Sequence, residues 1–203
     1  MVLKYQVILG LGSNRSFEGN TPLELLALSC IRLGEFIEDI EWSSVYRTEA
    51  MYVKAQDDFH NMAVTGIFEG SPRSLLEKIH IVEASFGRDR RREFRNGPRP
   101  LDIDIEVFGS EKVDEPDLQI PHPRMGERAF VLVPVLEVLK KNADAHKDSI
   151  SLYEKKLSVL DGQRVDFALD SQDFGRLVYR LRQGGEKYGR DRKYGGKSGF
   201  TET

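Results

Sequence analysis

Residues 97 to 109 read GPRPLDIDIEVFG, which places two aspartates inside an otherwise aliphatic run. Aliphatic residues at every second position are typical of a β-strand, because successive side chains of a strand point to opposite faces. The aliphatic residues then share one face, which we expect to be buried: Leu101, Ile103, Ile105 and Val107. Asp102 and Asp104 share the other face, about 7 Å apart.

Upstream of this strand, strand and helix patterns alternate. Strands are expected at 4–11, 40–49 and 61–70, and helices at 21–34 and 71–87. Thr21 and Ser71 are suited to cap these helices, and a proline follows each of them. The order predicts an α+β fold, a ferredoxin-like βαββαβ sandwich with helices on one face of an antiparallel sheet. Further elements are expected after it: helices at 126–140 and 149–157 and a strand at 163–170.

Length and composition suit one globular domain with a real core. The chain has 203 residues, of which 39% are hydrophobic and 31% charged. A net charge of −3 argues against a general nucleic-acid or anionic-membrane binder. No stretch approaches the roughly 18 apolar residues of a membrane-spanning helix. The single cysteine, Cys30, fits a reducing compartment. We therefore expect a cytoplasmic protein, without a membrane partner and monomeric.

The aspartate pair is spaced to bind divalent metal. Two neighbouring carboxylates repel each other, and Mg²⁺, which prefers carboxylate oxygens, offsets that repulsion. An Asp-x-Asp pattern alone is a weak signal and favours a solvent-facing strand with ordinary surface acids. The preceding stretch is rich in arginine and includes Arg88 and Arg99, and guanidinium groups match phosphate oxygens. Together the carboxylates and arginines favour a site for a polyphosphate with Mg²⁺. His122, held between two prolines, is suited to donate to a phosphate, although a surface histidine is an equal alternative.

Six motifs carry a resemblance to a known family. They occur in the order LGLGSN (9–14), SSVYRTEAM (43–51), FHNMAV (59–64), VEASFGR (82–88), the quoted strand, and IPHPRMGERAFVLVPV (120–135). The chain from about residue 3 to 160 thereby resembles the 6-hydroxymethyl-7,8-dihydropterin pyrophosphokinases of folate biosynthesis. The resemblance implies transfer of pyrophosphate from ATP to the pterin's hydroxymethyl group, with AMP as the second product.

The resemblance also implies roles for particular residues. Asp102 and Asp104 match the family's ligands for two Mg²⁺ ions, and Arg88 and Arg99 match arginines that engage the ATP phosphates and assist catalysis. The other residues matched to ATP are Glu83, His122 and Arg128. The residues matched to the pterin are Thr48, Phe59, Asn61 and Phe130. Considered singly, each of the two phenylalanines favours plain core. The loops at 49–60 and 88–97 are candidate lids.

The expected division of the chain follows the extent of the resemblance. We expect a pterin pyrophosphokinase domain at 1–160, a partly structured extension at 161–182, and a disordered tail at 183–203 that is basic and rich in Gly and Tyr. An RNA-binding sheet is the alternative function, because a ferredoxin-like sheet with a basic tail can bind RNA. The carboxylates on the fourth strand disfavour it, so no nucleic-acid partner is expected for the core.

Overall fold

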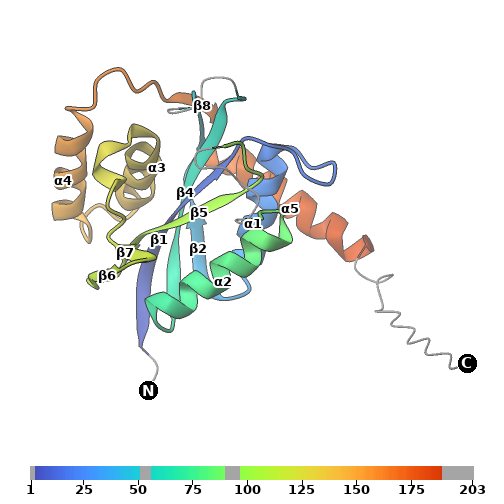
Figure 1. Cartoon of the computed structure of the whole chain (residues 1–203), viewed down its shortest axis with the longest axis horizontal. Helices are drawn as coiled ribbons and strands as arrows, with labels where there is room; N and C mark the ends of the chain where they lie inside the picture. The colour runs from blue at the N-terminus through green and yellow to red at the C-terminus, as the bar shows by residue number, and fades with distance from the viewer. Residues whose placement is uncertain (1–2, 51–55, 90–96, 189–203) are drawn as a thin grey trace, which may run out of the picture.

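A computed structural model describes residues 3–50, 56–89 and 97–188, and its centre is an antiparallel sheet (Figure 1). The hydrogen-bonded order is β5-β1-β4-β3-β8, and β2 pairs with β4 beside β3. The six strands are β1 (Lys4–Ser13), β2 (Ile37–Trp42), β3 (Val45–Thr48), β4 (Phe59–Glu69), β5 (Asp102–Phe108) and β8 (Asp166–Leu169). The expected strand at 40–49 is thus two strands, β2 and β3, separated by the buried pair Ser43 and Ser44. The strand expected at 163–170 is confirmed as β8.

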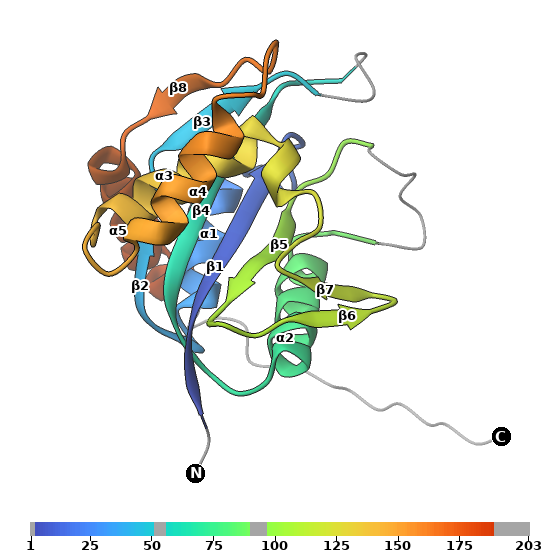
Figure 2. The ribbon, with the colours of Figure 1, turned by 90° about the vertical axis from the view of Figure 1, so that its left-hand side faces the viewer.

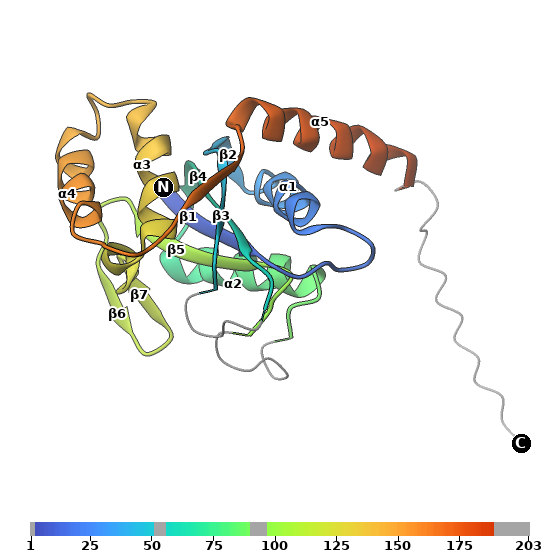
Figure 3. The same ribbon diagram turned by 90° about the horizontal axis from the view of Figure 1, so that it is seen from above.

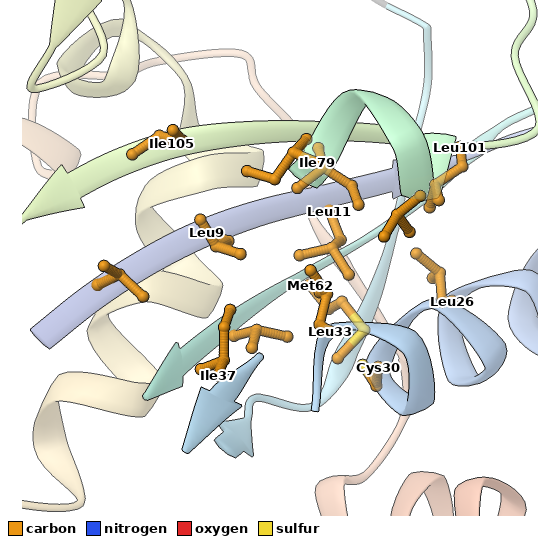
Figure 4. Close-up of a cluster of buried hydrophobic side chains, with 14 of the residues drawn as sticks. Leu9, Leu11, Leu26, Cys30, Leu33, Ile37, Met62, Ile79, Leu101 and Ile105 are labelled. Carbon is orange, nitrogen blue, oxygen red and sulfur yellow. The ribbon is translucent and has the colours of Figure 1, made fainter. Parts of the chain in front are cut away.

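Two helices cover the first face of the sheet, α1 (Pro22–Leu33) and α2 (Pro72–Ser85). Thr21 begins α1 with a capping box, since its hydroxyl accepts from the Glu24 N–H and the Glu24 carboxylate accepts from the Thr21 N–H. The apolar sides of these helices pack on alternate residues of the strands. Figure 4 shows this core, with Leu9 and Leu11 of β1 between Ile105 of β5 and Met62 of β4.

The opposite face carries a second, smaller core under α3 (Ala129–Lys140) and α4 (Lys147–Leu157). Ile8 of β1 and Ala63 of β4 pack there against Val131, Leu132 and Val135 of α3. Figure 3 shows these two helices on one side of the sheet and α1 and α2 on the other. Helices therefore lie on both faces: α1 and α2 share the first face, and the later helices α3 and α4, for which the sequence pattern predicted no face, cover the second. The helices expected at 126–140 and 149–157 are themselves confirmed.

A β-bulge corrects the expected alternation of β5. The pairing with β1 shifts between Ile8, opposite Val107, and Leu9, opposite Ile105, so Glu106 has no directly paired residue. Because of this extra residue, Phe108 joins the core formed with α1 and α2. Val107, expected in that core, packs with the α3 and α4 side chains instead.

The C-terminal part holds a helix that the sequence pattern did not predict. This helix, α5 (Ser171–Tyr188), packs on α1 through the buried side chains of Phe174 and Val178. It passes the expected boundary at 183, and the tail beyond Tyr188 lies outside the described residues. The division at residue 160 stays a prediction. The remaining elements are the hairpin β6 (Val113–Glu115) and β7 (Leu118–Ile120) and the 3₁₀ helix η1 (Met125–Glu127).

Within the described ranges, no helix combines the length and the apolar character needed to cross a bilayer. The central parts of the two candidate lids, residues 51–55 and 90–96, lie outside the described residues, so the lids also stay a prediction.

Candidate functional site

The aspartates of β5 border a strip of bare backbone on β1. In the sheet register, Gly12 lies opposite Asp102 and Gly10 lies opposite Asp104. Directly paired residues of antiparallel strands project from the same face, so both carboxylates stand beside positions that lack a side chain. A Cβ on Gly12 would lie 3.0 Å from Asn61 Oδ1, and one on Gly10 would lie 2.8 Å from a Glu106 carboxylate oxygen. The two glycines therefore leave the space above this strip of β1 free of side chains.

Two arginines among the described residues contact Asp102. Arg88 Nη1 lies 2.6 Å from one carboxylate oxygen, and Arg99 Nη1 lies 2.7 Å from the other. Arg88 also forms an ion pair with Glu83, which is 1% exposed and accepts from the Ile103 N–H at 2.9 Å. Glu83 thus fastens α2 to β5 and fixes Arg88 beside Asp102. These positive charges offset the negative charge that the strand brings into a partly buried place.

Burial disfavours ionisation of the next two acids of β5. Burial, with the charge of Asp102 as the second cause, raises the pKa of Asp104 to about 7. Burial, followed by the charge of Asp104, raises the pKa of Glu106 well above its usual range. Glu106 is fully buried, and neither of its carboxylate oxygens has a hydrogen-bond partner among the residues that the structure describes. A bound cation would relieve this accumulation of acidic groups.

His122 lies next to these acids as a neutral ring. Its backbone N–H donates to the Glu106 carbonyl at 3.1 Å, and its Nδ1 accepts from the Arg124 N–H at 3.3 Å. Burial comes first, and the charges of Arg128 and Arg124 second, in lowering the pKa of His122 to about 4. Because Nδ1 accepts, the proton is assigned to Nε2, which can donate to an anion.

An amide and an aromatic ring, those of Asn61 and Phe59, stand on the other side of the glycine strip. Asn61 of β4 lies opposite Gly12, and its Nδ2 donates to the Thr48 hydroxyl at 2.8 Å; both residues are buried. Phe59 precedes Asn61 by two residues and therefore shares its face. Phe130 comes from the first turn of α3, where its ring centroid lies 5.5 Å from the guanidinium carbon of Arg128.

The residues singled out in the sequence on the strands and their neighbouring loops form two groups at this end of the sheet. The first group contains the β5 aspartates with Glu83, Arg88, Arg99 and His122, and the second contains Thr48, Phe59 and Asn61. The first turn of α3 adds Arg128 and Phe130. Gly12 separates the groups, so the sheet register sets the distance between them.

Sequence reasoning missed two residues of the site. Asn14 links the segment before β5 to the segment before β4. Its Oδ1 accepts from the Arg99 N–H at 2.8 Å, and its Nδ2 donates to the Asp57 carbonyl at 3.0 Å. Its signal was available as the last residue of the LGLGSN motif. Glu106 is the second, and the third acid of the DIDIE run was its signal.

Paired carboxylates with arginines, next to an amide and aromatic rings, define a class of site that suits a magnesium–polyphosphate complex beside a flat polar ring. Residues 8–140 match the family model described as 7,8-dihydro-6-hydroxymethylpterin-pyrophosphokinase. The chain belongs to this family.

Curated relatives agree with the family model. The chain is 36% identical over 123 residues to the Bacillus subtilis 2-amino-4-hydroxy-6-hydroxymethyldihydropteridine pyrophosphokinase, a match covering 58% of this chain and 72% of that protein. It is 36% identical over 132 residues to the Aquifex aeolicus protein of that name, covering 65% and 79%. It is also 35% identical over 158 residues to an Arabidopsis thaliana folate synthesis bifunctional protein, covering 77% of this chain and 31% of the relative. The chain therefore spans under a third of that relative.

A solved structure supports the fold alone. A crystal structure of HPPK-DHPS from Plasmodium falciparum matches with a TM-score of 0.50 at 13% identity, over 95% of this chain and 48% of that one.

Proposed function

We propose that this chain transfers the pyrophosphoryl group of ATP to the hydroxymethyl group of 6-hydroxymethyl-7,8-dihydropterin. The products are AMP and the pterin diphosphate, in a reaction of folate biosynthesis. The observation that supports this most is the register across three strands, Asp102 opposite Gly12 and Gly12 opposite Asn61. Two strand spacings of about 4.8 Å put the carboxylates and the amide about 10 Å apart. That separation leaves room for a flat bicyclic ring between its recognition group and the phosphates.

The pterin end of the site would be formed by Asn61 and the two phenylalanines. A pterin presents adjacent donors and acceptors along one edge, and a side-chain amide offers both. Thr48 accepts one Asn61 N–H and so fixes which way the amide points. Phe59 and Phe130 would enclose the ring faces from β4 and from α3. The hydroxymethyl group then points along the strip toward Asp102.

The donors at the other end fit Mg²⁺. Asp102 and Asp104 supply hard carboxylate oxygens, and a cation bound there would favour the ionised form of Asp104, whose pKa is raised by burial and by the charge of Asp102. Within the described ranges no cluster of three or more metal-binding side chains occurs. Water and phosphate oxygens would therefore have to complete the coordination of an ion held by these two aspartates. Two Mg²⁺ ions are proposed, which when bound would neutralise phosphate charge and orient the β-phosphorus.

The arginines have a second task in this proposal. Both oxygens of Asp102 are engaged by Arg88 and Arg99. For Asp102 to serve a cation, at least one guanidinium must turn to the phosphates. Each arginine would thereby neutralise charge on the transferred group, as phosphoryl-transfer sites require. His122 and Arg128 would donate to the nucleotide from the opposite side.

The ferredoxin-like arrangement remains part of the proposal, as do a cytoplasmic location and a monomeric state. The strand order β5-β1-β4, with β2 and β3 on the far side of β4, supports the ferredoxin-like arrangement. In that arrangement the first and third strands of the βαββαβ unit, here β1 and β4, lie in the middle of the sheet.

An assay with ATP, the pterin alcohol and Mg²⁺ tests the function. We expect AMP and the pterin diphosphate in equal amounts, measured by chromatography and mass spectrometry. Asn61→Ala should raise the KM for the pterin at least tenfold, since it removes the amide that recognises the polar edge. Asn142→Ala, at an exposed position, is the control. Release of ADP with a pterin monophosphate, or no reaction at all, would refute the assignment.

A further inference from the structure

Gln163 binds the start of α3 with both ends of its side-chain amide. Its Oε1 accepts from the Ala129 N–H at 2.8 Å, and its Nε2 donates to the Glu127 carbonyl at 2.9 Å. Gln163 follows these residues by more than thirty positions and lies beyond the matched range of 8–140. The amide therefore joins a segment outside the family match to a turn inside it.

Among the described residues, this turn has no side-chain cap from its own N-cap residue. Arg128 occupies the N-cap position of α3, and within the described part of the chain its side chain makes no capping hydrogen bond. The first N–H groups of a helix lack partners inside the helix, and a polar side chain normally satisfies one of them. Gln163 supplies that acceptor from a distant part of the chain.

The same segment continues into the central sheet. After Gln163 the chain forms β8, which pairs with β3 and places Asp166 opposite Arg47 and Phe167 opposite Tyr46. The rings of Phe167 and Tyr46 meet edge to face at 6.2 Å. β3 also carries Thr48, the partner of Asn61. Figure 2 shows the chain leaving α4 and returning along β3 as β8.

Residues 163–169 therefore connect the two walls of the pterin site. One end holds the first turn of α3, which carries Arg128 and Phe130. The other end holds β3, next to Phe59 and Asn61 on β4. The start of α3, which carries Phe130, is thus linked to β3 through Gln163 and β8.

We propose that Gln163 is a positioning residue that sets the width of the pterin pocket by holding the start of α3. This inference rests on the proposed function, because it concerns the same ring site. Gln163 touches neither substrate. It acts through the backbone at 127–129 and so through the place of Phe130.

The test compares Gln163→Ala with Gln163→Glu in the full chain. Loss of both hydrogen bonds should weaken pterin binding about tenfold, with a smaller change in kcat. Gln163→Glu keeps the acceptor for the Ala129 N–H and loses the donor to Glu127, so it should recover part of the affinity. Gln172→Ala, an exposed glutamine on α5, is the matched control and should behave as the wild type.

Two further measurements separate positioning from plain stabilisation. Hydrogen exchange at the amides of 129–132 should speed up in Gln163→Ala. The denaturant midpoint of the whole protein should stay close to the wild-type value. Wild-type pterin affinity in Gln163→Ala would overturn the inference, as would a loss of affinity that merely follows a loss of global stability. A wild-type chain that releases no AMP would overturn the proposed function instead.

Discussion

Replacing Asp104 with asparagine should make the metal-free protein more stable and the enzyme inactive. Burial and the charge of Asp102 raise the pKa of Asp104 from 3.8 to about 7. That rise is about three pKa units, or roughly 4 kcal/mol at about 1.36 kcal/mol per unit. Since the folded-state pKa lies above the unfolded-state value, the unfolded chain loses its proton first. The contribution of Asp104 to stability is therefore complete below about pH 3.8 and lost as the pH rises to about 7.

The assay is urea unfolding with EDTA present at several pH values from 5 to 9. Asparagine stays neutral throughout, so Asp104→Asn should raise the free energy of unfolding at pH 8.5 by roughly 2–4 kcal/mol, and by somewhat less than half as much at pH 5. Asp144→Asn, at an exposed position, is the control. With Mg²⁺ and both substrates, turnover of Asp104→Asn should fall by orders of magnitude. A variant less stable than the wild type at pH 8.5, or one that keeps its turnover, would refute the assigned burial or the assigned metal role.

Two further substitutions test neighbouring features. Gly12→Ala places a Cβ 3.0 Å from Asn61 Oδ1 and 3.7 Å from a ring carbon of Phe59, so it should raise the KM for the pterin severalfold and leave the KM for ATP near the wild-type value. Equal increases in both KM values would contradict the assignment of this strip to the pterin. Glu106→Leu removes a buried carboxyl without hydrogen-bond partners in the described residues, and should raise the free energy of unfolding at pH 7 by about 1–3 kcal/mol. The gain should shrink toward pH 4.5, because the folded-state pKa of Glu106 is raised; destabilisation at pH 7 would show that Glu106 has a partner in solution.

The sequence predicted the first half of the fold because its signals there are local. Thr21 and Glu24, three residues apart, form the capping box of α1. Proline follows the N-cap residue of both α1 and α2. α5 was missed although Phe174, Val178 and Leu181 follow helical spacing. Gly175 and a surplus of charged residues interrupt that pattern, and α5 is fixed by packing on α1, which no local signal records.

The sequence allowed the residues of the candidate site to be predicted, but not the contacts between them. The carboxylates, Arg99 and Asn61 stand in recognisable motifs, so each could be singled out alone. The contact of Arg88 with Asp102 depends on where α2 ends relative to β5, and the hydrogen bond from the Ile103 N–H to Glu83 joins these two elements. The contribution of Gln163 depends on a chain reversal over more than thirty residues. Tertiary contacts of that kind leave no periodic trace in the sequence.

The bulge at Glu106 explains how one strand serves both a site and two cores. Before the bulge, the second face of β5 carries Asp102 and Asp104, and the paired positions of β1 are glycines. After it, the same face carries Val107 opposite Ile8, and both pack under α3 and α4. On both β5 and β1 the change from polar or bare positions to apolar ones occurs at this bulge. The core under α3 and α4 therefore ends where the site begins, and its last residues form a wall of the site. A carboxyl trapped at this boundary meets apolar packing on one side and like charge on the other, which accounts for the raised pKa of Glu106.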